Sequence, residues 1–223
     1  MNYTDFDIGK YAWKFPQEFE DKIYYTSDTH FLHENILGYC SRPFKNIEEH
    51  DEALIKRWNE KVPEDGLVFH LGNVGMGNSG RLTDILSRLN GYIYLIIGNH
   101  DWRENIAKQS WRFLGMTQQV NMTVGGQQII LNHYPLACFS GSYRKKPVWQ
   151  LYGHIHTSPY STGVDVWRMA KNLLPNQYDV GVDNNDFTPL SHKEVKEIID
   201  KAIAKNDPNK IVTDFEKIKN RNG

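Results

Sequence analysis

The stretch YIYLIIGNHD, residues 92–101, contains the pattern that decides the fold. Its opening run is apolar and rich in β-branched and aromatic side chains, which predicts a buried strand over residues 92–97. Gly98, Asn99, His100 and Asp101 follow at once. Ligands of α/β sheets bind beyond the carboxyl ends of the strands, so this arrangement indicates a functional site at that edge.

The same arrangement recurs along the chain. Further β-branched and aromatic runs predict strands at residues 22–27, 66–71, 120–124, 127–133, 148–154 and 178–182. Polar side chains end or follow four of these runs, namely Asp28 and His30, Asn73, His133, and His154 and His156. Five strand ends in all would therefore supply imidazole, carboxylate and amide groups, as a metal site with nitrogen and oxygen ligands requires.

Helical patterns separate the early strands. Residues 47–60, 81–89 and 102–113 predict helices, so the first half should contain βαβ units. Gly125-Gly126 lies between two β runs and predicts a hairpin, which places antiparallel pairing in the second half. Ser191 and Glu194 have capping-box spacing and predict a helix over residues 191–205.

The length of the chain suits one domain with a substantial core. We expect a single domain over residues 1–223, with a catalytic core over 22–205. Residues 1–20 are interpreted as an N-terminal extension and residues 206–223 as a polar tail.

Composition excludes several classes of protein. With a net charge of −1, the chain lacks the excess of basic residues that is typical of proteins that bind duplex DNA or an anionic membrane. Two distant cysteines, Cys40 and Cys138, indicate neither a disulfide framework nor a thiolate zinc site, and both are expected to be buried thiols. The chain lacks an apolar run long enough to span a membrane and a signal pattern, so we expect a cytoplasmic protein, in the host cytoplasm if a phage encodes it.

The spacing of the polar residues has physical reasons. In Asp28-x-His30 and His154-x-His156, alternate residues of an extended segment point to the same side and can reach one locus. Glycines at 72, 98 and 153 allow sharp turns and leave room for ions and substrate. Each motif alone could be a turn or a satisfied core histidine, but the ordered set favours a metal site.

The ordered motifs resemble those of the calcineurin-like metallophosphoesterases: D-x-H at 28–30, Gly72 with its neighbour, G-N-H-D at 98–101, a lone histidine before Tyr-Pro, and G-H-x-H at 153–156. The resemblance covers residues 22–156, and residues 178–195 also resemble the closing segment of small phage and bacterial members. It implies an α/β fold in which a ββ sandwich is flanked by helices in four layers, αββα. The metal site would lie at the carboxyl edges of the strands.

The resemblance also implies a ligand set for two divalent metal ions. One ion would be held by Asp28, His30 and His156, and the other by Asn99, His133 and His154, with Asn73 at the bridging position. His100 would lie beside the ions as a general acid. Manganese is the expected metal, and iron, zinc or nickel suit the same ligands.

The implied activity is hydrolysis of a phosphomonoester or phosphodiester by metal-activated hydroxide, without a covalent enzyme intermediate. The expected substrate is a small phosphorylated or nucleotide-like molecule. The alternative is a catalytically silent protein that binds a phosphate ligand on the same fold.

Asn73 departs from the family pattern, in which the residue after Gly72 is an aspartate. An amide offers one good oxygen ligand and no charge, so two cations would repel each other with less compensation. The second site, which has no other carboxylate, should lose affinity most. Asn73 is explained either by an engineered aspartate-to-asparagine change, which we favour, or by a natural variant with reduced or altered activity.

Further residues are candidates for substrate contacts, namely His33, Arg42 and Asp101. Helix capping explains His33 equally well, and a surface ion pair is the favoured interpretation of Arg42. Met76 stands where longer members of the family have an aspartate that orients the catalytic histidine. We expect His50 and His192 at the surface and His70 buried in a strand.

Overall fold

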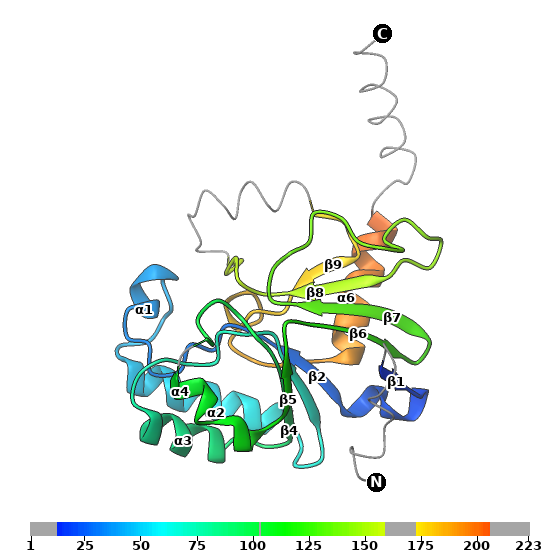
Figure 1. Cartoon of the computed structure of the whole chain (residues 1–223). Helices are drawn as coiled ribbons and strands as arrows, with labels where there is room; N and C mark the ends of the chain where they lie inside the picture. Colours follow the sequence, from blue (N-terminus) through cyan, green and yellow to red (C-terminus); the bar gives the residue numbers. More distant parts are fainter. Residues whose placement is uncertain (1–12, 103, 159–172, 206–223) are drawn as a thin grey trace.

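The computed structural model describes residues 13–102, 104–158 and 173–205 and contains two five-stranded sheets (Figure 1). The sheet that we call the first has the order β10-β2-β3-β4-β5. Its strands are β10 (Leu190–Ser191), β2 (Ile23–Thr26), β3 (Leu67–His70), β4 (Tyr92–Ile96) and β5 (Phe113–Thr117). The pairs from β2 to β5 are parallel and β10 is antiparallel to β2, so the predicted βαβ units are confirmed.

The second sheet has the order β1-β6-β7-β8-β9. Its strands are β1 (Trp13–Phe15), β6 (Gln119–Val124), β7 (Gln127–Asn132), β8 (Trp149–Tyr152) and β9 (Gln177–Asp179). The predicted hairpin joins β6 to β7, and Gly125 and Gly126 turn it with φ values of 51° and 78°. The other three pairs are parallel, so this sheet is also mixed.

The main core lies between the two sheets, because alternate residues of each strand point inward. Tyr25 and Phe69 of the first sheet share one buried cluster with Leu131 and Leu151 of the second. On the opposite face of the first sheet, Val68 belongs to a second cluster. The helices in that cluster are α2 (Ile47–Lys61), α3 (Ser79–Ser87) and α4 (Glu104–Ala107), which lie together beside β4 and β5 in Figure 1.

One further long helix, α6 (His192–Lys205), closes the open side of the sandwich. It contacts β10, β2 and β9 and places Val195 and Ile199 in the core between the sheets. Its predicted capping box is confirmed, since the Ser191 backbone N–H donates to the Glu194 carboxylate at 2.9 Å. The remaining short elements are α1 (Ile36–Tyr39), η2 (Gln17–Lys22), η3 (Ser110–Arg112) and η4 (Val182–Asn184).

The predicted fold class is confirmed: two mixed sheets form a sandwich that helices flank. On the outer face of the second sheet, the loop over residues 134–148 contacts β8 and β9, where its backbone carbonyls at Tyr134 and Leu136 accept hydrogen bonds from Gln150 and Gln177. No helix in the described part of the chain is long and apolar enough to cross a bilayer.

One expectation about a single segment was wrong. Residues 102–113 do not form one helix: α4 and η3 are short, and Phe113 already begins β5. Within the expected extension of residues 1–20, β1 pairs with β6, and Phe15 and Phe19 are buried in the core. The expected tail, 206–223, lies outside the described residues.

Four side chains also differ from expectation in their burial. His50 and His192 are buried rather than exposed, because both make buried contacts with polar side chains. Cys138 is exposed, and Cys40 is only partly buried. His70 is buried in β3, as predicted.

Candidate metal centre

The chain turns sharply just after the carboxyl ends of β2, β3 and β8, where the predicted ligands lie. Asp28, His30, Asn73, His154 and His156 all have positive φ, between 47° and 71°. Such left-handed positions are uncommon outside glycine, although Asn, Asp and His adopt them more readily than most residues. Backbone strain of this kind clusters at functional sites.

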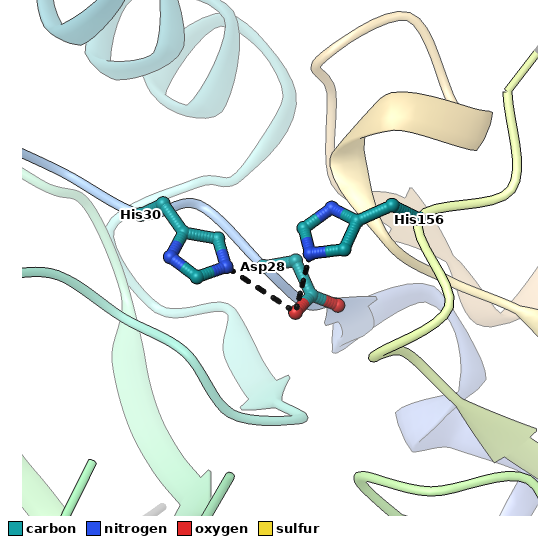
Figure 2. Close-up of side chains that lie close together, drawn as sticks. All are labelled: Asp28, His30 and His156. Carbon is teal, nitrogen blue, oxygen red and sulfur yellow. Dashed lines mark ion pairs between the residues drawn. The ribbon is translucent and has the colours of Figure 1, made fainter. Parts of the chain in front are cut away.

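Three predicted ligands form one compact group (Figure 2). Asp28 Oδ1 lies 3.7 Å from Nε2 of His30 and 3.7 Å from Nε2 of His156. These distances are too long for hydrogen bonds. They suit three ligands around one ion, because a metal bound at about 2.1 Å separates its ligand atoms by somewhat more than 3 Å.

His30 tests whether a metal ion fits this group. Both of its ring nitrogens are buried, and neither has a hydrogen-bond partner in the described part of the chain. Buried polar atoms normally have a hydrogen-bond partner, so a bound ion would explain why these nitrogens have none within the described chain. Burial lowers the pKa of His30 to about 3, so at neutral pH the ring is uncharged and can offer a lone pair to a cation.

The charges around Asp28 also favour a cation. Burial raises the pKa of its carboxyl, but the nearby His156, His30 and His133 outweigh this and hold it well below its usual range. Burial alone would lower the pKa of His156, yet the carboxylates of Asp28 and Asp183 hold it well above its usual range. Both shifts show that the surroundings of Asp28 favour positive charge, which a bound metal ion would supply.

Two glycines make room for this arrangement, as predicted. A Cβ on Gly153 would lie 2.1 Å from Ser27 Oγ and 2.3 Å from Asp28 Oδ2. A Cβ on Gly72, which has a φ of 94°, would lie 2.7 Å from His133 Nδ1. Both positions require glycine because the strand-end loops approach each other closely.

The second predicted group, Asn99, His133 and His154, is also assembled. His133 Nδ1 lies 2.6 Å from the Leu71 carbonyl oxygen, which can only accept, so Nδ1 carries the proton. His133 Nε2 faces Asn99 Oδ1 at 2.9 Å, and the His154 ring lies 5.1 Å from that of His133. An imidazole nitrogen and an amide oxygen that converge in this way are suitable ligand atoms for a cation, but the group contains no carboxylate.

Asn73 lies between the two groups. Its Oδ1 accepts a hydrogen bond from the His100 backbone N–H at 3.0 Å. This bond fixes the amide, so Nδ2 donates to Asp28 Oδ1 at 3.0 Å and to Asn99 Oδ1 at 3.2 Å. The side chain therefore reaches both groups with its amide nitrogen, which cannot bind a metal ion.

The predicted general acid is next to the first group. The half-buried His100 ring lies 5.5 Å from the ring of His30, and the His33 ring lies 5.3 Å from His30 and 6.3 Å from His100. Asp101 is buried and accepts backbone hydrogen bonds from Gly98 at 2.8 Å and Asn73 at 2.7 Å. Asp101 thus holds two strand-end loops together and is not placed to meet a substrate.

Arg42 is inside the protein and neither at the substrate entrance nor in a surface ion pair. Its guanidinium binds both carboxylate oxygens of Asp183 at 2.8 Å. Asp183 in turn lies 2.7 Å from His156 Nδ1. We did not predict Asp183 from the sequence, although it follows the run at residues 178–182 just as the predicted ligands follow theirs.

Comparisons with known proteins agree with this geometry. The family model for calcineurin-like phosphoesterases matches residues 21–216. A Methanocaldococcus jannaschii protein, MJ1445, is 30% identical over 183 residues, which cover 81% of this chain and 93% of that protein. The gene 66 protein of Mycobacterium phage L5 is 25% identical over 186 residues, covering 72% of this chain and 86% of its own.

A solved structure gives the same picture of the fold. The Aquifex aeolicus protein AQ665 superposes with a TM-score of 0.60 at 21% identity, and the match covers 79% of this chain and 98% of that protein. The family model spans both groups of predicted ligands and all strands except β1. The chain therefore belongs to the calcineurin-like phosphoesterase family, whose members are metal-dependent hydrolases.

Proposed function

We propose that this chain is a dinuclear metal-dependent phosphoesterase that hydrolyses a phosphomonoester or phosphodiester, and that Asn73 reduces its activity. The observation that carries the proposal is the group of Asp28, His30 and His156, in which His30 has two buried ring nitrogens without hydrogen-bond partners among the described residues. We expect a small phosphorylated or nucleotide-like substrate, because the net charge of −1 gives no footprint for duplex nucleic acid.

Two divalent cations, once bound, would polarise the phosphoryl group and activate water for attack. Asp28, His30 and His156 would hold one cation. Asn99, His133 and His154 would hold the other. Manganese is the first ion to test, and iron, zinc and nickel suit the same mixed ligand set.

The other side chains would orient the reactants and move the proton. His100 is half-buried beside His30 and would protonate the leaving oxygen, a role that suits imidazole. Asp101 holds the loops that contain Asn73 and His100 in place through three backbone N–H groups. Because these loops are already fixed, no free energy is needed to reorganise them during the reaction.

Asn73 also supports the alternative function, a silent protein that binds a phosphate ligand. Its amide group donates to Asp28 and Asn99, the oxygen ligands of the two proposed ions. Those hydrogen bonds compete with metal binding, and they bring no negative charge between the cations. We infer that the second ion binds weakly while residue 73 is asparagine.

The decisive experiment compares the chain with its Asn73→Asp variant, using Mn²⁺ and the two substrates p-nitrophenyl phosphate and bis(p-nitrophenyl) phosphate. A bridging carboxylate would hold the second cation, and a metal ion contributes several kcal/mol of charge stabilisation in the transition state, so turnover should rise on the order of 100-fold or more. Asn121→Asp makes the same chemical change at an exposed position of β6 and should leave the rate unchanged.

Equal rates for the unmodified chain and its Asn73→Asp variant would refute the bridging assignment. Tight binding of phosphate without turnover in both forms would establish the binding protein instead. The native gene decides the origin of the amide: an asparagine codon there excludes an engineered change.

A further inference from the structure

We propose that Asp183 and Arg42 are positioning residues that fix the ring of His156 for metal binding. The inference rests on the metal centre of the proposed function and adds two residues to it. Neither would touch the metal ion or the substrate. They would act through His156, the ligand that the second sheet contributes to the first ion.

The contact between Asp183 and His156 sets which nitrogen faces the metal. Asp183 Oδ2 lies 2.7 Å from His156 Nδ1, and an ionised carboxylate can only accept, so Nδ1 carries a proton. Nε2 is then the nitrogen directed toward Asp28 Oδ1, at 3.7 Å. A carboxylate that binds the far nitrogen of a ligating histidine orients the ring and increases its basicity.

Arg42 holds the carboxylate of Asp183 in place. Its Nε and Nη2 bind the two oxygens of Asp183, both at 2.8 Å, and the two side chains are 0% and 2% exposed. Such a two-point contact fixes the plane of the carboxylate as well as its position. Asp183 therefore cannot rotate away from His156 without breaking a buried ion pair.

The same guanidinium also binds the loop that contains the other two ligands. Arg42 Nη2 donates to the Asp28 carbonyl at 2.7 Å, and Nη1 donates to the Thr29 carbonyl at 3.0 Å. Arg42 thus joins the loop after β2, with Asp28 and His30, to His156 on the loop after β8. Through Asp183, this one side chain helps to set the distance between ligands from the two sheets.

His50 also contacts the guanidinium of Arg42, at Nη1. His50 Nε2 lies 2.8 Å from Arg42 Nη1, so Nε2 accepts and His50 Nδ1 donates to Asp51 Oδ1 at 2.8 Å. This links the guanidinium to helix α2. Buried ion pairs are a poor source of stability because desolvation offsets their attraction. The network is better explained by the geometry that it imposes on the ligands.

A competing arrangement is a metal site made of Cys40, His156 and Asp183, whose potential ligand atoms lie within 4.8 Å of one another. There Asp183 would be a ligand, and His156 would bind through Nδ1. Both Asp183 oxygens are already bound by Arg42, whose positive charge opposes a cation at that position. The geometry therefore favours binding through Nε2.

Binding of Zn²⁺ and Mn²⁺, followed by calorimetry on the full chain, tests the proposal without any substrate. Asp183→Asn should weaken binding of the first ion by about 10- to 100-fold, as loss of such supporting contacts does in other metal sites. Arg42→Lys, which keeps the charge but not the two-point contact, should weaken it in the same direction. Asp186→Asn is the matched control, because Asp186 is an exposed acid in the same segment.

The His156→Ala background separates positioning from a general loss of structure. If Asp183 acts through His156, adding Asp183→Asn to His156→Ala should leave metal affinity unchanged from the single variant. An equal loss in both backgrounds would overturn the proposal, as would wild-type affinity in the Asp183→Asn protein.

Nitrogen NMR of the unmodified, zinc-loaded chain gives a second test if the variants fold poorly. We expect zinc on His156 Nε2 and a retained proton on Nδ1, and zinc on Nδ1 would overturn the assignment. Failure of the proposed function looks different: metal binding would still depend on Asp183 while no phosphoester was hydrolysed. Hydrolysis with Asp183-independent metal binding would overturn only the present inference.

Discussion

At the scale of the residue, Gly153 is where the loop after β8 approaches the ligand Asp28 most closely. Gly153→Ala would press a methyl group against Ser27 Oγ and Asp28 Oδ2. We expect a loss of about 1–3 kcal/mol in the free energy of unfolding, as overpacking usually causes. Metal affinity should fall too, because Asp28 Oδ2 also accepts the His154 backbone N–H at 2.8 Å.

Urea unfolding and metal-binding calorimetry would measure both effects. Gly38→Ala is the control, since a Cβ there meets nothing within 4 Å and the residue lies in α1. It should be neutral or slightly stabilising. Wild-type stability and affinity in Gly153→Ala would show that the loop can move aside, and that the tight contact has no role in holding Asp28.

Residues of the site could be predicted from the sequence where they belong to a short local motif or to the ordered set of such motifs. Asp28 with His30, or His154 with His156, form short motifs that follow an apolar run, so one window of sequence contains the evidence. Arg42 and Asp183 are 141 positions apart. Asp183 does follow the run at residues 178–182, but no local signal pairs it with Arg42. Their pairing is a product of the folded chain, which brings the segment before α2 beside the end of β9.

At the scale of the element, β1 was the clearest omission. It has three residues, and its partner β6 is distant in sequence, so no neighbouring turn identifies it as a strand. Its burial comes from Phe15 at 4% exposure, which packs in the core between the sheets. The segment precedes the region matched by the family model, yet it completes the edge of the second sheet.

This placement predicts that Phe15→Ala destabilises the whole sandwich. Deletion of a buried phenylalanine ring typically costs about 3–5 kcal/mol of unfolding free energy. Leu114→Ala on β5 is the control, because Leu114 is 48% exposed and should cost no more than about 0.5 kcal/mol. Chemical denaturation followed by tryptophan fluorescence measures both. If Phe15→Ala lowered the free energy of unfolding as little as Leu114→Ala, β1 would contribute little to the stability of the sandwich.

The segment over residues 102–113 shows why a helical pattern can be overridden. Its apolar spacing predicts a helix, but Phe113 is required in β5, where it pairs with Ile93 of β4. Just after α4 ends at Ala107, the buried side chain of Gln109 binds Ser79 at the start of α3. Pairing of a sheet edge and a buried hydrogen bond outweigh local helix propensity here.

At the scale of the whole molecule, the candidate metal centre forms only when the two sheets pack together. Asp28, Asn73 and Asn99 follow strands of the first sheet, whereas His133, His154 and His156 follow strands of the second. The sequence predicted that these strand ends converge, because the order of the motifs matched a known family. The energetic basis of the convergence, a shared core between the sheets closed by α6, became clear only from the structure.

That closure makes stability depend on pH through His192, at the start of α6 and remote from the metal ligands. His192 stacks on Trp149 at 5.6 Å, and its Nδ1 lies 3.0 Å from the Tyr25 hydroxyl. Burial lowers the pKa of His192 to about 4, whereas an unfolded chain has a value near 6.5. Between these values the unfolded state binds more protons, so stability must fall as the pH falls from 6.5 to 4.

The pKa values of His192 in the folded and unfolded states differ by roughly 2.5. This difference corresponds to about 3 kcal/mol of unfolding free energy lost between pH 6.5 and pH 4. Urea unfolding of the metal-free protein at successive pH values would measure the slope. His192→Gln removes the titrating group, so its stability should decline less steeply by about one proton, while Lys193→Gln on the exposed face of α6 should follow the wild type. If unfolding free energy depended on pH equally in His192→Gln and the wild type, this histidine would already be protonated in the folded protein.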